Sequence, residues 1–254
     1  GGGSAYDKHQ YTSIKNTFAI ALLEGFNKYM KAGLKAFASY EYRRFRLPQL
    51  LEGSTAYYLQ TDKGHCLNIG GQMSKTQGET FHFNLGGEVG LTGYDQGALK
   101  LNFSTDLNFR LMGDTVRLAA KANFDRTIPT YMQNHFHSKH LWWENSLDAE
   151  TRTHLEGIFA YDKTDTRLRV AIDEIQNYTY FGMSYTPTET GRTALTGNVY
   201  QEASNINVLT LQLQQHLRWG ILNWENILTY QNCSMPSVLP LPDLNLFSNL
   251  YLKF

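Results

Sequence analysis

Three histidines, His135, His137 and His140, stand together as HxHxxH and form the first group of residues whose types and spacing could do chemistry. Histidines two residues apart share one side of a strand and could bind zinc or copper, with Glu144 as a further ligand. No cysteine or aspartate supports the group, and histidines among aromatic residues more often pack and form hydrogen bonds. We therefore expect no metal and no other cofactor, and keep these histidines as the alternative.

A second group consists of aromatic residues in two long connections: Trp142, Trp143, Tyr178, Tyr180 and Phe181. Such rings could form a platform on which sugars stack. They could equally form an aromatic belt at a membrane interface or pack the loops together, and we favour this second reading.

Nucleophilic catalysis is a third possibility, since His82, His154 and many serines are present. No motif places a serine beside a histidine with an orienting partner, so we expect no enzyme. Cys66 and Cys233 fit no CxxC pattern, and many predicted strands separate them, so we expect both thiols to be unpaired.

Charged residues also follow a regular pattern, which is clearest over residues 99–124. Odd positions from Leu99 to Leu111 are apolar except Thr105, even positions between them are polar, and alternation resumes at Val116 after a turn at residues 112–114. This period of two predicts a long β-hairpin with one apolar and one polar face. The polar rows of this and neighbouring hairpins hold the predicted pore-lining residues: Lys100, Asp106, Arg110, Arg117, Lys121, Asp125, Arg152, Glu156, Arg167, Arg169 and Asp173.

Strand length separates the possible classes of protein. Each arm of this hairpin has roughly a dozen residues, whereas strands of globular proteins usually have about 5–6. A tilted strand of that length crosses a bilayer, with lipid on its apolar side and water on its polar side. A long hairpin of a soluble sandwich or β-helix is the alternative.

The whole chain gives about eleven such strands, and the connections between them alternate in length. Connections near residues 26, 76, 113, 163 and 220 are short, and those near 50, 140, 190 and 238 are long, with Tyr94 as a short exception. Short turns at one rim and long loops at the other are typical of outer-membrane barrels. We expect loops at 47–64, 126–150 and 176–204, and a gathering of arginines from the polar rows, Arg152 included, near the short-turn rim.

Composition excludes other classes. The 254 residues include 23 basic and 23 acidic residues, so no net charge favours nucleic acid. Aromatic residues make up 13% of the chain, and no apolar run approaches the length of about 18 residues that a transmembrane helix needs.

Several stretches resemble the putative porin family of Bacteroidota outer membranes. They are NHFHSKHLWWEN, RTHLEGIFAYDKTDTRLRVAIDEIQNYTYF, NWENILTYQ, LPLPDLNLFSNLYLKF and, near the start, ALLEGFNKYMKAGLKAFASYEYRRF. The resemblance covers roughly residues 6–254. It implies an outer-membrane β-barrel with an aqueous interior, and it brings no catalytic residues.

We therefore expect an all-β fold, an antiparallel up-and-down transmembrane β-barrel, with residues 1–254 in one domain. Family members are longer and single-chain bacterial barrels have even strand numbers, so we expect further strands outside this chain. The alternative is that residues 250–254 end the barrel.

The expected function is a channel in the bacterial outer membrane for passive diffusion of small hydrophilic solutes. Its partners would be outer-membrane lipid, these solutes, no nucleic acid, and a possible protein partner in an outer-membrane complex. One alternative is a non-transporting barrel that is structural or anchors a surface or secretion assembly. Another is a soluble carbohydrate-binding β-protein.

Overall fold

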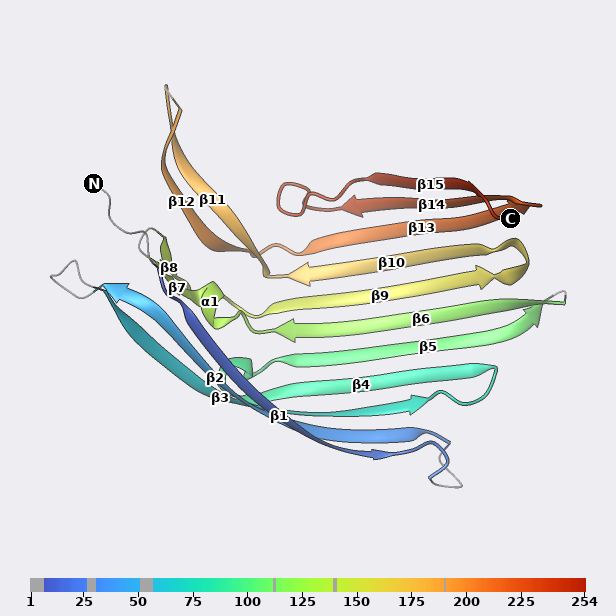
Figure 1. The fold of residues 1–254 in the computed structure, drawn as a ribbon, viewed down its shortest axis with the longest axis horizontal. Coiled ribbons are helices and arrows are strands. Elements are labelled where there is room, and N and C mark those ends of the chain that lie inside the picture. The colour runs from blue at the N-terminus through green and yellow to red at the C-terminus, as the bar shows by residue number, and fades with distance from the viewer. Residues whose placement is uncertain (1–6, 27–30, 51–56, 112, 139–140, 190) are drawn as a thin grey trace.

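One antiparallel sheet of eleven strands dominates the computed structural model, which describes residues 7–26, 31–50, 57–111, 113–138, 141–189 and 191–254. Its spatial order is β1-β2-β3-β4-β5-β6-β9-β10-β13-β14-β15, so every strand lies beside the next sheet strand along the chain (Figure 1). The expected all-β, up-and-down arrangement with eleven long strands is confirmed.

The strands of this sheet have 9 to 19 residues. Their bounds are β1 Gln10–Leu22, β2 Gly33–Leu50, β3 Tyr57–Lys75, β4 Phe81–Thr92, β5 Leu99–Leu111, β6 Asp114–Thr127, β9 Glu150–Tyr161, β10 Thr166–Gln176, β13 Ile206–Trp219, β14 Leu222–Cys233 and β15 Leu244–Leu252.

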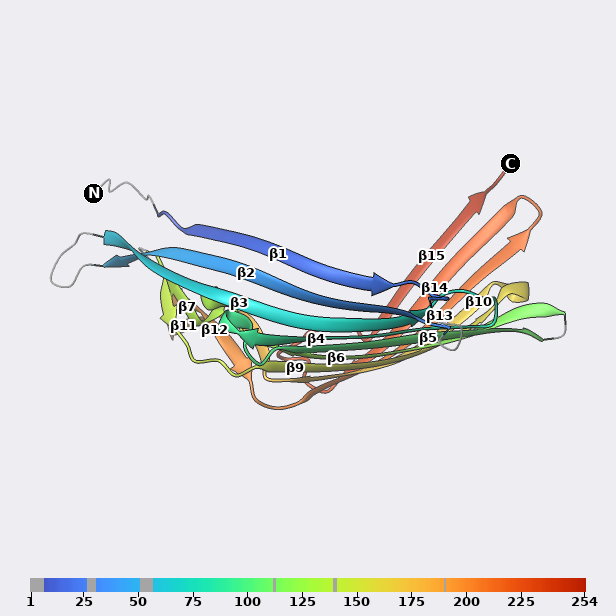
Figure 2. The same ribbon diagram turned by 90° about the horizontal axis from the view of Figure 1, so that it is seen from below.

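The sheet curves strongly and forms an open trough. In Figure 2 the edge strands β1 and β15 both rise on the same side of the sheet. They are the two ends of the strand order and do not pair with each other. The described strands therefore form an open, curved wall, and this sheet does not close on itself.

The β5–β6 hairpin shows how the sequence pattern produces the sheet. Leu101 pairs with Phe124 on one face, and Asn102 pairs with Asn123 on the other. Gly113 in the turn has φ +90°, a conformation that glycine adopts without steric cost. Most register steps along the middle of the hairpin thus place apolar beside apolar and polar beside polar residues.

The described part of the loop expected at residues 47–64 is strand instead. β2 continues to Leu50, β3 starts at Tyr57, and Leu47 pairs with Gln60, while residues 51–56 lie outside the described residues. Pro48 suggested a break, but β1 starts at Gln10 opposite Arg46, so this end of β2 pairs only with β3. A proline at a free strand edge leaves no ladder hydrogen bond unmade, so it does not end the strand.

The other two expected loops also contain structure. Residues 176–204 form a separate hairpin of β11 (Tyr178–Thr188) and β12 (Gly191–Glu202). Residues 126–150 hold α1 (Tyr131–Asn134) and a small hairpin of β7 (His135–His137) and β8 (Trp142–Glu144). Both hairpins lie at the end of the sheet opposite the short turns (Figure 1), so the predicted separation of short turns from long connections is confirmed.

No helix in the described part of the chain is long and apolar enough to span a membrane. Buried apolar residues gather where a connection folds back on the sheet. Ile175, Ile206 and Val208 pack beneath the loop between β14 and β15, which contributes Val238 and Leu239.

Candidate functional site

The two faces of the sheet reverse the usual exposure of side chains in a soluble protein, where apolar side chains are buried and polar ones are exposed. Large apolar side chains on one face stay exposed, for example Leu155 at 52% and Ile172 at 51%. Polar side chains on the other face are buried, for example Glu156 at 8% and Thr210 at 5%. Side chains crowd together on a concave face and spread apart on a convex one. We therefore identify the polar face as the concave inner wall of the trough.

The register places all the predicted pore-lining residues on this inner wall. Asp106 pairs with His82, Lys121 pairs with Glu156, and Arg167 pairs with Gln214. The remaining members follow at alternate positions of the same strands: Lys100, Arg110, Arg117, Asp125, Arg152, Arg169 and Asp173. Whether these residues line an open pore stays a prediction.

Glu156 is the centre of an ionic network on the wall. Lys121 Nζ lies 3.0 Å from Glu156 Oε1, and Arg169 Nε donates to Glu156 Oε2 at 2.5 Å. His154 lies beside this group and bonds to Asp173 through Nδ1 at 2.6 Å. Adjacent strands are thus tied together by opposite charges, as expected for charges facing one another across a sheet.

A second network lies nearer the short turns. Asp106 Oδ2 accepts hydrogen bonds from His82 Nδ1 at 2.9 Å and from Asn108 Nδ2 at 3.0 Å. Arg117 Nη2 lies 3.8 Å from Asp106 Oδ1, so this arginine is only loosely paired.

Three arginines close to the short turns form the group that we call the basic collar: Arg110, Arg117 and Arg167. Arg110 lies opposite Thr115 beside the β5–β6 turn, and Arg167 lies opposite Ala160 beside the β9–β10 turn. Both are exposed, and within the described ranges neither has a carboxylate within ion-pair distance.

The expectation that Arg152 joins this gathering is wrong. Arg152 is the third residue of β9 and lies at the rim of the long connections, opposite Ile175. It is paired there with Glu150, and its guanidinium lies 5.9 Å from the ring of Tyr178. Because β9 runs toward its short turn, its first residues lie at the opposite rim.

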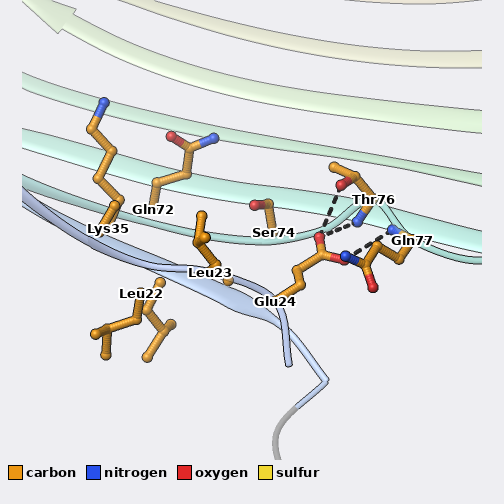
Figure 3. Close-up of a pocket in the computed structure, with 11 residues that line it drawn as sticks. Leu22, Leu23, Glu24, Lys35, Gln72, Ser74, Thr76 and Gln77 are labelled. Carbon is orange, nitrogen blue, oxygen red and sulfur yellow. Dashed lines mark hydrogen bonds between the residues drawn. The ribbon is translucent and has the colours of Figure 1, made fainter. Parts of the chain in front are cut away.

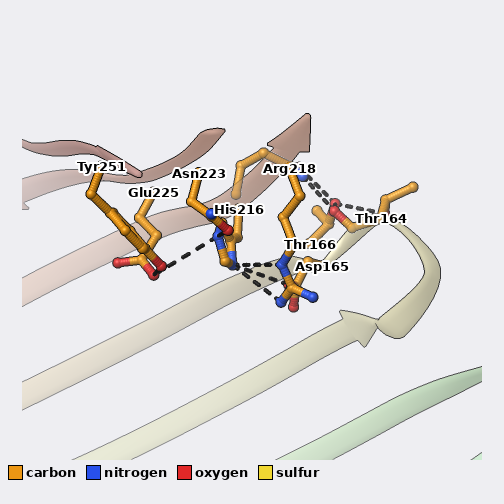
Figure 4. Close-up of polar contacts among 9 residues, drawn as sticks. Thr164, Asp165, Thr166, His216, Arg218, Asn223, Glu225 and Tyr251 are labelled. Atoms are coloured by element: carbon orange, nitrogen blue, oxygen red, sulfur yellow. Dashed lines mark hydrogen bonds and ion pairs between the residues drawn. The ribbon is translucent and has the colours of Figure 1, made fainter. Parts of the chain in front are cut away.

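The short-turn rim carries a further polar group between β10 and β15 (Figure 4). Asp165 accepts from Arg218 and lies 3.3 Å from His216 Nδ1, while Tyr251 donates to Glu225 at 2.8 Å. Asp165, His216 and Arg218 line a cavity of about 640 Å³ beside the β9–β10 turn.

A carboxylate also ties together two short turns at the other side of the sheet (Figure 3). Glu24, which follows β1, accepts hydrogen bonds from the Gln77 amide at 2.9 Å and from the Thr76 hydroxyl at 3.0 Å. Burial favours its protonated form, but the hydrogen bonds outweigh this and lower the pKa of Glu24. The adjoining cavity of about 390 Å³ also touches Lys35 and Gln72.

The short connection between β4 and β5 folds inward onto the wall, although its length alone predicted a simple turn. Its 3-10 turn, η1 (Gly93–Asp95), places the Asp95 carboxylate against Arg43, with Nη–Oδ distances of 2.7 and 2.9 Å. Arg43 also donates to Glu41 at 2.7 Å. A bidentate pair of this kind fixes both position and orientation.

Glycines make room for this turn. A Cβ on Gly90 would lie 1.9 Å from the Asp95 carbonyl oxygen, and one on Gly64 would lie 2.6 Å from the ring of Tyr94. Tyr94 donates to Asp62 at 2.9 Å, and burial raises the pKa of its phenol. Glycines inside otherwise alternating strands were the sequence signal that another backbone approaches closely.

The small β7–β8 hairpin brings His135, His137 and Glu144 together. Glu144 bridges both histidines, one through each carboxylate oxygen, and His137 also contacts Gln49 of β2. His140 lies outside the described residues. Within the described ranges, no three His, Cys, Asp or Glu side chains are placed to hold a metal ion.

The aromatic residues of the long connections divide into packed and exposed members. Trp143 is buried, stacks on Phe136 at 4.6 Å and donates to the Met132 carbonyl at 3.1 Å, which fits a packing role. Trp142 and Phe181 are exposed at 68% and 71%.

Tyr178 and Tyr180 stack at 6.0 Å near the base of β11. Tyr131 of α1 stacks on Phe45 of the inner wall at 4.4 Å, and burial raises its pKa to about 12. The connection between β6 and β9 therefore folds over the inner wall at the long-connection rim.

Comparison with known proteins identifies one family, and the similar solved structures include two siderophore receptors. The family model described as Putative porin matches residues 3–254. The siderophore receptor PirA from Pseudomonas aeruginosa superposes with a TM-score of 0.67 at 14% identity, over 96% of this chain and 45% of that one. PirA from Acinetobacter baumannii gives a TM-score of 0.57 at 12% identity, over 89% and 37%.

The chain thus spans less than half the length of these receptors, and at such identities the likeness shows the fold alone. No curated protein matches the chain. The family match names no bacterial group, so the Bacteroidota part of the resemblance stays a prediction.

Proposed function

Because the chain belongs to the putative porin family, we propose that it forms part of the wall of an outer-membrane β-barrel through which small hydrophilic solutes diffuse. The observation that carries this proposal is the reversed exposure of the two faces. The apolar face would lie against lipid and the charged, concave face against water. The proposal assigns the chain no catalytic activity and no metal.

Ion pairing differs between the middle of the proposed lumen and its short-turn end. Lys121 and Arg169 share the carboxylate of Glu156 in the middle of the wall, whereas Arg110 and Arg167 of the basic collar have no ion-pair partner among the described residues. In the usual orientation of a barrel the short turns face the periplasm. We therefore propose a modest preference for anions at that exit.

A non-transporting barrel that anchors a surface assembly is the second candidate. It is favoured by the inward packing of α1 and of the β14–β15 loop, both of which cover part of the polar face. A soluble carbohydrate-binding protein is disfavoured by the many exposed apolar side chains on the outer face.

Membrane fractionation and conductance of the full-length protein test these candidates in sequence. We expect the protein in outer-membrane fractions, extracted only by detergent, and we expect ion-conducting steps when it is reconstituted in a planar bilayer. A protein that is soluble without detergent would refute both barrel candidates. A membrane protein that never conducts would refute the channel and leave the anchoring barrel.

A further inference from the structure

A small charged cavity lies on the inner wall beneath the inward-folded η1 turn, away from the basic collar. It has a volume of about 220 Å³. Its charged lining comes from β1, β2, β4, η1, β5 and β6: Lys15, Arg43, Glu88, Asp95, Lys100 and Arg126.

On one side of this cavity the carboxylates already form ion pairs with Arg43. Both carboxylate oxygens of Asp95 accept from Arg43, and Asn68 Nδ2 lies 3.3 Å from Oδ2 of the same group. Glu41, behind the cavity, accepts from Arg43 and from Ser13. Arg43 is therefore shared by two carboxylates, and this fixed group carries one negative charge in excess.

Three other cationic side chains line the cavity and could bind a ligand there. Within the described residues, neither Lys15 nor Lys100 has a carboxylate oxygen within 4.0 Å, and Arg126 donates only to the carbonyl of Gly97. Glu88 is the lining carboxylate that Arg43 does not engage. In the register Lys15 lies opposite Glu41, and Lys100 lies between Glu88 and Asp125, of which Glu88 lines the cavity and Asp125 does not. The lining itself thus has more unpaired positive than negative charge.

We propose that this cavity is a binding subsite for a small multivalent oxyanion, with inorganic phosphate as its simplest representative. Two ammonium groups and one guanidinium supply donors of the kind that bind phosphate oxygens. A concave wall concentrates their field, because the low-dielectric protein behind them does not screen it. The proposal rests on the channel function, since it places the subsite along the path of the solute.

Isothermal titration calorimetry of the full-length protein in detergent tests the subsite with inorganic phosphate at constant ionic strength. We expect saturable binding in the wild type. The double variant Lys15→Gln/Lys100→Gln should bind at least about tenfold more weakly, as expected when charge-assisted hydrogen bonds are lost. Glu88→Gln should bind more tightly because it removes a repelling charge, and a misfolded variant would not give that gain.

Lys121→Gln is the matched control, because it removes an inner-wall lysine that is already paired with Glu156. Unchanged phosphate affinity in this variant supports a local subsite, whereas a loss equal to that of the double variant would overturn it. Absence of saturable binding in the wild type would also overturn it. A protein that binds phosphate but does not conduct would keep the subsite and refute the channel, and one that conducts without binding would do the reverse.

Discussion

The outer face of the sheet should tolerate charge far less than the inner face at the same height. β5 has 13 residues, so at a rise of about 3.4 Å per residue and a tilt of about 45° it spans about 29 Å, close to the thickness of a hydrocarbon core. Phe103 lies two residues from the strand's central Thr105, which is about 5 Å from the midplane along the membrane normal. Arginine near the midplane costs about 2–4 kcal/mol. Phe103→Arg should therefore lower the folding equilibrium constant by a factor between about thirty and several hundred.

Asn102→Arg is the matched control, because Asn102 is the adjacent residue and points to the inner wall opposite Asn123. Its cost should stay within about 0.5 kcal/mol. Equilibrium unfolding by denaturant in lipid vesicles measures both variants, and Leu209→Arg repeats the outer-face test on β13. Equal destabilisation by Phe103→Arg and Asn102→Arg would refute a lipid-facing outer wall.

Three further results are expected. Changing all three basic-collar arginines to glutamine should shift the reversal potential in a planar bilayer toward cations, and an unchanged ion preference would count against the collar. Gly90→Ala should destabilise the protein by about 1–3 kcal/mol, because its methyl group would meet the Asp95 carbonyl, and denaturant unfolding measures the loss. Burial favours protonated Glu144, but hydrogen bonds from His135 and His137 outweigh it and lower the pKa below 4.5. The resulting stabilisation of the β7–β8 hairpin is complete above pH 4.5 and is lost as the pH falls through the folded-state pKa, so fluorescence of the buried Trp143 should report loosening only in acid.

The sequence sufficed for the features that depend on local alternation. Leu99 to Leu111 and the turn at Gly113 predicted β5, β6 and their faces correctly, because a period of two fixes which side chains share a face. The two cysteines are free, as predicted from the many strands that separate them in the sheet.

Features that depend on contacts between distant strands could not be predicted from local alternation. The turn at Tyr94 looked like a simple short exception, yet Arg43, 52 residues from Asp95 in the sequence, draws it onto the wall. The β11–β12 hairpin was missed because its many threonines and tyrosines show no clean apolar row. Arg152 was misplaced because its charge was considered without the direction in which β9 runs.

The open edges of the sheet constrain whatever completes the ring. Ten successive antiparallel pairings separate β1 from β15, so the two edge strands run in the same direction. Joining them directly would create a parallel seam, and joining two copies around a common barrel axis would create two such seams. A ring that is antiparallel throughout therefore takes up an odd number of additional strands, from whichever polypeptide they come.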